Sequence, residues 1–141
     1  MPNSAEGYAV DTSVAVPALD AGHAAHGACA DAVRSLRPAL AGHAAFETFS
    51  VLTRMPGGLA IDAPTATALL ARVFPDIAWL TGRHAVDLLR RLGPLGVVGG
   101  GVYDALVAEA ARRRDLILLT RNRRAGPTYD LVGVRQRFVG T

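Results

Sequence analysis

The stretch GVYDALVAEAARRRDLILLT, residues 101–120, decides the fold. Residues 102–114 carry apolar side chains at helical spacing and end in three arginines, which complement the negative end of a helix dipole. Residues 116–119 form an unbroken apolar run, as expected of a strand that is buried on both faces. A helix that leads into a buried strand is the repeating unit of a parallel α/β sheet.

The rest of the chain repeats this alternation. Apolar periodicity and the Gly and Pro positions predict strands at residues 8–10, 39–42, 76–80 and 133–139, and helices at residues 23–36, 44–55, 63–73 and 83–92. Asp62 is the expected N-cap of the helix over 63–73. Right-handed crossovers place such helices on both faces of the sheet. The expected fold class is therefore α/β: a three-layer α/β/α sandwich with a mostly parallel central sheet, in a single domain over residues 1–141.

Composition excludes several classes of protein. The chain has 141 residues, half of them hydrophobic, which is enough for one buried core. The sequence contains no apolar stretch of about 18 residues that would predict a membrane span. The first residues, MPNSAEGYAV, show no export signal, so a cytoplasmic location without membrane attachment is expected. The single cysteine, Cys29, is expected to be a buried structural thiol.

All the basic residues are arginine, and the net charge of +3 suits a polyanionic partner. The absence of lysine excludes Schiff-base chemistry, the P-loop and the phospho-acceptor receiver domain. The glycines at residues 99–101 lack the spacing of a dinucleotide-binding motif.

Four oxygen-bearing side chains are expected at one edge of the sheet. Asp11 and Asn122 directly follow strands, and ligands of open α/β sheets bind at the carboxyl ends of strands. Glu47 and Asp104 lie in the first turns of helices, which begin above that same edge. Carboxylates about 4 Å apart repel by roughly 4 kcal/mol at an effective dielectric constant of 20, so a cation should lie among them. Oxygen ligands favour Mg²⁺ or Mn²⁺ over Zn²⁺.

The histidines offer an alternative, a zinc site. His23, His26 and His43 lie near one another in sequence or near Glu47, but neither a cysteine pair nor an HExxH motif accompanies them. We therefore expect them to be surface or helix-capping residues.

Four strings of residues together resemble the PIN-domain ribonucleases, and in particular the VapC-type toxins of bacterial toxin–antitoxin pairs. They occur in the family's order over almost the whole chain: AVDTSVAV, ETFSVLTR, GVYDALVAEAA and LLTRNRRAGPTYDLVGV. The resemblance implies a PIN-like fold and a Mg²⁺- or Mn²⁺-dependent endoribonuclease that hydrolyses RNA phosphodiesters with metal-activated water. It implies Asp11, Glu47, Asp104 and Asn122 as catalytic residues and metal ligands, with Thr12, Ser13 and Thr120 orienting Asp11 or a metal-bound water.

One position departs from the family's pattern. Asn122 stands where toxins of this type often have aspartate, which removes one negative charge and leaves an oxygen ligand. An alternative function is therefore a PIN-like module that binds RNA or antitoxin but cleaves RNA weakly or not at all.

The resemblance also implies partners. These are an RNA substrate, a cognate VapB-type antitoxin whose helix covers apolar surface, and a second copy of the chain in a homodimer. Arg121, Arg123 and Arg124 adjoin Asn122 and are candidates for binding the RNA backbone, whereas the arginines at residues 112–114 are expected to be a solvated helix cap. Because few exposed aromatic residues are evident, base stacking is expected to be minor.

Overall fold

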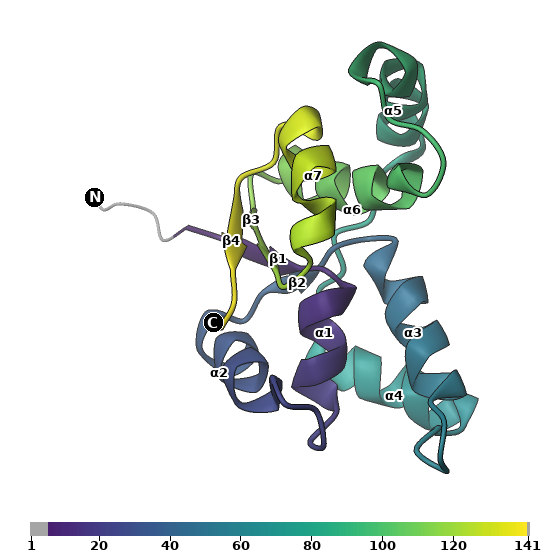
Figure 1. The fold of residues 1–141 in the computed structure, drawn as a ribbon, viewed down its shortest axis with the longest axis vertical. Helices are drawn as coiled ribbons and strands as arrows, with labels where there is room; N and C mark the ends of the chain where they lie inside the picture. The colour runs from purple at the N-terminus through teal and green to yellow at the C-terminus, as the bar shows by residue number, and fades with distance from the viewer. Residues whose placement is uncertain (1–5, 141) are drawn as a thin grey trace.

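The computed structural model describes residues 6–140, and Figure 1 shows the course of the chain. The elements follow one another in this order: β1 (Tyr8–Val10), α1 (Thr12–Leu19), α2 (His26–Leu36), β2 (Ala39–Leu40), α3 (Ala44–Arg54), α4 (Ala63–Val73), α5 (Gly82–Leu95), α6 (Gly101–Arg113), β3 (Ile117–Thr120), the 3-10 helix η1 (Arg123–Ala125), α7 (Gly126–Val132) and β4 (Gln136–Phe138).

The four strands form one parallel sheet in the order β2-β1-β3-β4. Every residue of β3 is buried, as its apolar run predicted. In Figure 1, α5, α6 and α7 lie on one side of the strands, and α1 to α4 lie on the other. The expected α/β/α arrangement with a parallel central sheet is confirmed.

Helix α1 was not predicted from the sequence. Three of its first five residues are β-branched and Pro17 lies inside it, a composition that disfavours helix in isolation. It forms because Val14, Ala15 and Pro17 are buried and the Asp11 carbonyl accepts hydrogen bonds from the Val14 and Ala15 amides. Tertiary packing thus overrides local propensity and fixes Asp11 as the N-cap of this helix.

The strand predicted at residues 76–80 was wrong. Only Ile77 pairs with the sheet, through an isolated parallel bridge to Leu40. No helix was predicted over residues 126–132, which form α7, with Pro127 in its first turn and Gly133 ending it at φ +97°. The predicted helix over 63–73 and its Asp62 cap are confirmed, with the Asp62 side chain accepting from the Thr65 amide.

Gly42 makes the turn from β2 into α3, the helix that carries Glu47. Its φ of +47° lies in the left-handed region, and a Cβ there would lie 3.1 Å from both the Ala110 Cβ and the Ala78 carbonyl oxygen. Only glycine fits this turn without strain, so Gly42 sets where α3 begins.

The core is made largely of small and branched residues around β1, β3 and the inner faces of α1 and α6. Cys29 is fully buried in it, as predicted. Among the helices that the structure describes, none combines the length and apolarity needed to span a bilayer.

Candidate active site

Asp11 is the centre of the hydrogen-bond network at the carboxyl edge of the sheet. Its side chain is buried, with the residue only 4% exposed, between the end of β1 and the start of α1. Ser13 Oγ donates to Asp11 Oδ1 at 2.6 Å, while Thr120 Oγ1 and Tyr129 OH both donate to Oδ2, the latter at 2.8 Å. Three donors stabilise the negative charge of this carboxylate and fix its orientation.

Of the hydroxyl residues predicted to orient Asp11, Ser13 and Thr120 bond it, whereas Thr12 bonds Glu47 instead. Thr12 Oγ1 donates to Glu47 Oε1 at 3.1 Å, and Ser13 Oγ accepts from the Arg121 amide at 2.7 Å. Thr120 Oγ1 accepts from the Asn122 amide at 3.0 Å. These bonds tie the end of β3 to the start of α1, so the segments that carry Asp11 and Asn122 are held together.

Glu47 and Asp104 lie in the first turns of α3 and α6, as predicted. Burial raises the pKa of the Glu47 carboxyl, and the charges of Asp104 and Asp11 raise it further, against the lowering effects of the Thr12 hydrogen bond and His43. Burial also raises the pKa of Asp104, where the Asp11 charge adds to the effect and Arg124 opposes it. The negative charge of Asp11 therefore disfavours the ionisation of both Glu47 and Asp104, and the charge of Asp104 adds to this effect at Glu47.

This arrangement fits a hard divalent cation by the chemistry of its donors. All the donors are oxygen, and a positive charge among them would offset both the burial and the repulsion that raise the pKa values of Glu47 and Asp104. Within residues 6–140, however, no three His, Cys, Asp or Glu side chains already lie close enough to form a finished metal site. That finding also extends to the zinc alternative. His23 Nδ1 instead accepts from the Ala25 amide, and His26 lies 2.8 Å from the Pro17 carbonyl oxygen.

Asn122 is placed at the same edge but has a structural role of its own. Its Oδ1 accepts from the Ala125 amide at 3.3 Å and so caps η1. It also lines a small hollow with Gln136 and Phe138, on the β4 side of the edge. The structure thus brings Asn122 next to Thr120 but directs part of its hydrogen-bonding capacity away from the acids.

Tyr129 is the site residue that sequence reasoning missed. It is 2% exposed and its hydroxyl bonds Asp11. Burial raises the pKa of the Tyr129 hydroxyl far above its ordinary value, and the charges of Asp11, Asp104 and Glu47 add to this effect, so the group remains a proton donor to Asp11. The string YDLV in α7 could have indicated Tyr129, because it places an aromatic residue at helical spacing after a strand. Helix α7 itself, however, was not predicted.

The three arginines after β3 have different environments. Arg121 donates to the Val139 carbonyl at 2.6 Å, and the Arg123 guanidinium lies 3.8 Å from the centre of the Phe138 ring. Arg124 is 77% exposed in its side chain and lies 3.9 Å from Asp104. Arg124 is therefore the most available of the three for an RNA phosphate beside the acids.

The expectation that residues 112–114 form a solvated cap holds for Arg114, which is the C-cap of α6 with its side chain 43% exposed, but was wrong for Arg112 and Arg113. Arg112 and Arg113 both bond the carboxylate of Glu109, whose side chain is fully buried, and Arg91 joins them at 3.1 Å. Arg114 pairs instead with Asp76. Arg112 and Arg113 therefore neutralise the buried carboxylate of Glu109, a role that the local sequence did not reveal.

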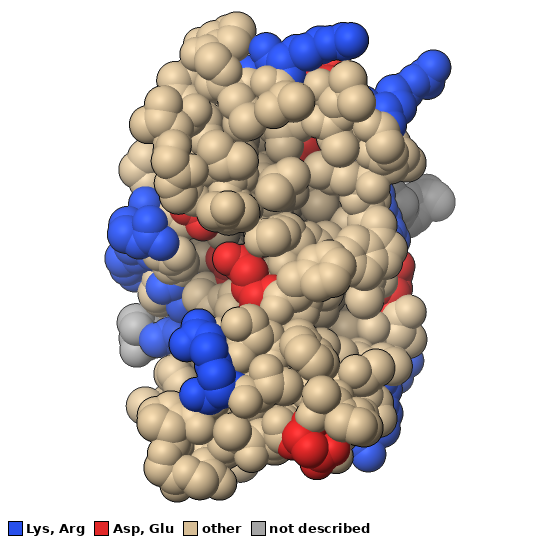
Figure 2. Space-filling view, turned by 90° about the vertical axis from the view of Figure 1, so that its right-hand side faces the viewer, with Lys and Arg blue, Asp and Glu red and all other residues tan. Residues whose placement is uncertain are grey.

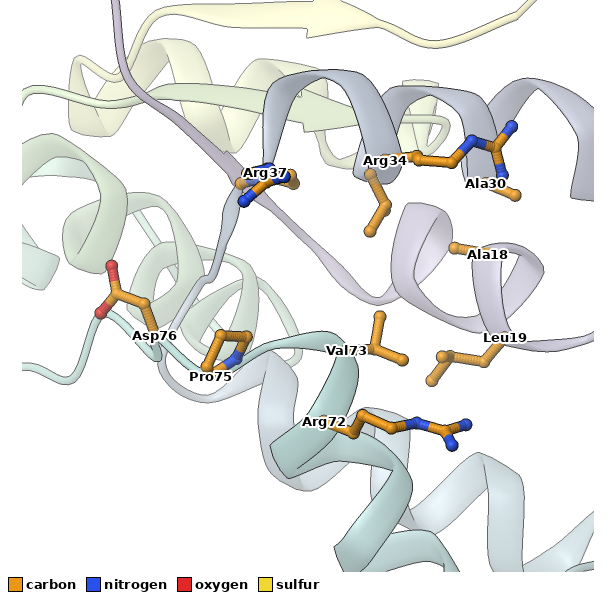
Figure 3. A pocket seen from close by; sticks show the side chains of 11 residues that line it. Ala18, Leu19, Ala30, Arg34, Arg37, Arg72, Val73, Pro75 and Asp76 are labelled. Carbon is orange, nitrogen blue, oxygen red and sulfur yellow. The ribbon is translucent and has the colours of Figure 1, made fainter.

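Two views locate the acids relative to the molecule's hollows. Figure 2 shows acidic atoms in a hollow at the middle of one face, with arginine atoms beside and below them. A different hollow, of about 490 Å³, is lined by Leu19, Val33, Arg37 and Arg72 among others (Figure 3). Its lining includes Pro38, which directly precedes β2, so it lies at the amino edge of the sheet and contains none of the predicted site residues.

Removing one of the repelling charges should stabilise the protein when no cation is present. We expect Glu47→Gln to raise the free energy of unfolding in EDTA by roughly 1 kcal/mol at neutral pH, the scale of a partly screened like-charge pair. Because the folded-state pKa of Glu47 is raised, ionised Glu47 lowers the free energy of unfolding of the wild-type protein above that pKa. This loss of stability disappears at low pH, where Glu47 is protonated in both the folded and the unfolded state. Thermal unfolding at several pH values measures this difference.

Added Mg²⁺ provides the matched control for the same variant. Wild-type protein should gain more stability from Mg²⁺ than Glu47→Gln, because binding to the folded state stabilises it. A variant that is less stable than wild type in EDTA at neutral pH would contradict the repulsion among the carboxylates.

Known proteins resemble this chain over most of its length. The family model of the PIN domain matches residues 8–129. The chain is 44% identical over 126 residues to Ribonuclease VapC27 of Mycobacterium tuberculosis, covering 89% of this chain and 92% of the relative. It is 38% identical over 134 residues to Ribonuclease VapC40 of Mycobacterium tuberculosis, covering 93% and 98%.

A solved structure shares the fold. The crystal structure of Mycobacterium tuberculosis VapC20, described as a sarcin-ricin loop cleaving toxin, aligns with a TM-score of 0.67 over 91% of this chain and 96% of that chain. The sequence identity in this alignment is 22%, so the likeness concerns the fold alone.

Proposed function

The chain belongs to the PIN-domain family and is a relative of the VapC ribonucleases, and from this premise we propose that it is the endoribonuclease toxin of a toxin–antitoxin pair. The observation that carries the proposal is the position of Asp11, Glu47 and Asp104 at one edge of the sheet, where burial, together with the charge of Asp11, raises the pKa values of Glu47 and Asp104. Partly or fully burying three carboxylates at one edge costs folding free energy, which a cation bound among them would offset.

Each group of residues at the site has a separate proposed role in hydrolysis. Asp11, Glu47 and Asp104 would hold Mg²⁺ or Mn²⁺, with Asn122 offering a fourth oxygen. Such a cation, when bound, lowers the pKa of water and stabilises charge on phosphoryl oxygens. Ser13, Thr120 and Tyr129 keep Asp11 oriented through their hydrogen bonds, and Thr12 does the same for Glu47. Arg124 provides an exposed guanidinium for a phosphate next to Asp104.

The reaction replaces one bond to phosphorus by another. A water oxygen forms a bond to the scissile phosphorus, the bond to the 3′ oxygen breaks, and that oxygen leaves with a proton. The products therefore carry 5′-phosphate and 3′-hydroxyl ends.

RNA cleavage by the purified protein tests this proposal. We expect cleavage with Mg²⁺ or Mn²⁺, none in EDTA, and products that a 5′-phosphate-dependent exonuclease can degrade. Cleavage that persists in EDTA, or products with 2′,3′-cyclic phosphate ends, would contradict the metal-dependent mechanism.

The second candidate, a binding module with weak or no cleavage, is favoured by Asn122, whose Oδ1 caps η1. Aspartate caps helices as well as asparagine does, so Asn122→Asp should keep the cap of η1 while adding a ligand charge. We expect roughly 10-fold tighter Mn²⁺ binding in this variant, because ligand charge tunes affinity over several decades. Calorimetric titration measures it, and unchanged affinity would remove residue 122 from the site.

The proposal extends to partners. A VapB-type antitoxin and a second copy of the chain are the expected protein partners, and co-purification from cells that express the neighbouring reading frame tests the first of them. Light scattering of the isolated chain tests the second.

A further inference from the structure

Four aromatic rings form a continuous row beside the acids. The His43 and Tyr103 rings are stacked at 5.3 Å and 20°, the His43 and Phe46 centroids are 6.2 Å apart, and those of Phe46 and Trp79 are 5.5 Å apart. Phe46, Trp79 and Tyr103 are each more than half exposed, at 64%, 52% and 53%. The row therefore presents ring faces and edges to solvent, and they are not buried in the core.

The row is tied to the site by the chain itself. Phe46 directly precedes Glu47 in the first turn of α3, and Tyr103 directly precedes Asp104 in the first turn of α6. Trp79 lies just beyond the Ile77 bridge, and so also at the carboxyl edge of the sheet. The other large hydrophobic side chains exposed in the described residues are aliphatic. Exposed aromatic surface is thus concentrated where the carboxylates meet.

A hollow of about 430 Å³ joins the row to charged groups. It is lined by Phe46 and His43, by Thr12 and Glu47, and by Arg54. A flat ring, a carboxylate and a guanidinium thus surround one space, and Arg124 lies near the second carboxylate, Asp104. A nucleotide needs this combination, because its base stacks on aromatic rings and its phosphate binds cations.

We propose that Tyr103, His43, Phe46 and Trp79 form a stacking platform for unpaired RNA bases next to the cleavage site. This inference rests on the proposed ribonuclease function and specifies its substrate as single-stranded RNA, since paired bases do not expose their faces. It replaces the expectation that stacking is minor. Phe46 and Trp79 also line a neighbouring apolar hollow with Phe49, Leu70 and Ile77, so a protein contact on this face is one of the outcomes that the test below distinguishes.

Trp79 is the protein's only tryptophan, so its fluorescence reports directly on the platform. The experiment titrates wild-type protein in EDTA with a short oligoadenylate and with an abasic ribose-phosphate oligomer of equal length. We expect the oligoadenylate to quench the fluorescence and to bind more tightly than the abasic oligomer, because both carry the same phosphates but only the first can stack.

Variants separate stacking from general apolar contact. With labelled oligoadenylate, Trp79→Leu and Phe46→Leu should each weaken binding by about 5- to 150-fold, the range found for losing one stacked base. Trp79→Phe should restore most of the affinity. Leu89→Ala is the control, because it removes exposed apolar surface from a residue on α5 that is 71% exposed and outside the row, and it should leave binding unchanged. Abasic oligomer should bind all four variants equally.

Several outcomes would overturn the platform: no binding of oligoadenylate, equal binding of the abasic oligomer, or equal affinity of Trp79→Leu and Trp79→Phe. A Trp79 signal that follows protein concentration without RNA, with a doubled mass in light scattering, would assign the face to a protein contact and also overturn it. Because binding is measured in EDTA, where no metal-dependent cleavage occurs, the stacking platform and the nuclease function can be contradicted independently of each other. Base-dependent binding without cleavage in Mg²⁺ would contradict only the nuclease, and cleavage that Trp79→Leu leaves unchanged would contradict only the platform.

Discussion

Replacing Asp104 by asparagine is expected to lower kcat/KM for RNA cleavage by at least about 100-fold while the protein remains folded. The Asp104 side chain is 18% exposed at the start of α6, and it is one of three carboxylates proposed to hold the cation. The substitution keeps the size and one oxygen of the side chain but removes its charge. Steady-state cleavage of a labelled RNA at saturating Mg²⁺ measures the loss.

Stability should change little in the same variant. The loss of a favourable charge at a helix N-terminus costs about 0.3 to 1 kcal/mol, and relief of the repulsion with Asp11 and Glu47 offsets it. Asp31→Asn is the control for a charge change without a role in the site, because Asp31 is 70% exposed on α2. Equal cleavage rates for Asp104→Asn and Asp31→Asn would contradict the proposed role of Asp104.

Glu109→Gln is expected to lower the free energy of unfolding by about 3 kcal/mol at neutral pH. Glu109 is fully buried, and its burial, which alone would raise its pKa, is outweighed by hydrogen bonds from Arg112 and Arg113 and by the charges of Arg112 and Arg91, so its pKa falls to about 2. A drop from 4.5 to about 2 corresponds to about 3 kcal/mol of stabilisation. The variant also leaves three arginines around a neutral side chain.

The pH dependence of this difference has a definite sign. The folded-state pKa of Glu109 is lowered, so its stabilisation is fully present above the ordinary carboxyl pKa and is lost as the pH falls toward 2. Urea unfolding at several pH values should therefore show wild type and variant converging in acid. A difference that persists undiminished at low pH would contradict the ionic origin of the stabilisation, and Asp31→Asn again serves as the surface control.

Much of the fold follows from residue patterns that act locally. The apolar run of β3 and the amphipathic pattern of α6 predicted both elements. A strand that is buried on two faces needs consecutive apolar residues, and a helix that is buried on one face needs them at helical spacing. Asp62 capped its helix as predicted, since a cap depends on nearest neighbours. Helices α1 and α7 were missed because their stability comes from burial against elements far away in the chain, which a local pattern does not record.

In the candidate site, too, the features that follow from local patterns were predicted, and those that depend on long-range contacts were missed. Parallel topology was enough to place Asp11, Glu47 and Asp104 at one edge, because strand ends and helix starts meet there. Tyr129 could not be found this way, since its contact with Asp11 joins residues 118 positions apart. The aromatic row was missed for a similar reason: its members lie on separate segments, and their exposure is a property of the folded surface.

The most direct test of the central claim is a calorimetric titration of wild-type protein and of the double variant Glu47→Gln/Asp104→Asn with Mn²⁺. We predict saturable binding to wild type, at least about 100-fold weaker binding to the double variant, and a variant that is as stable as wild type or more so in EDTA. Equal Mn²⁺ binding by the two proteins, or no binding by wild type, would contradict the claim that these carboxylates form the metal site of a ribonuclease.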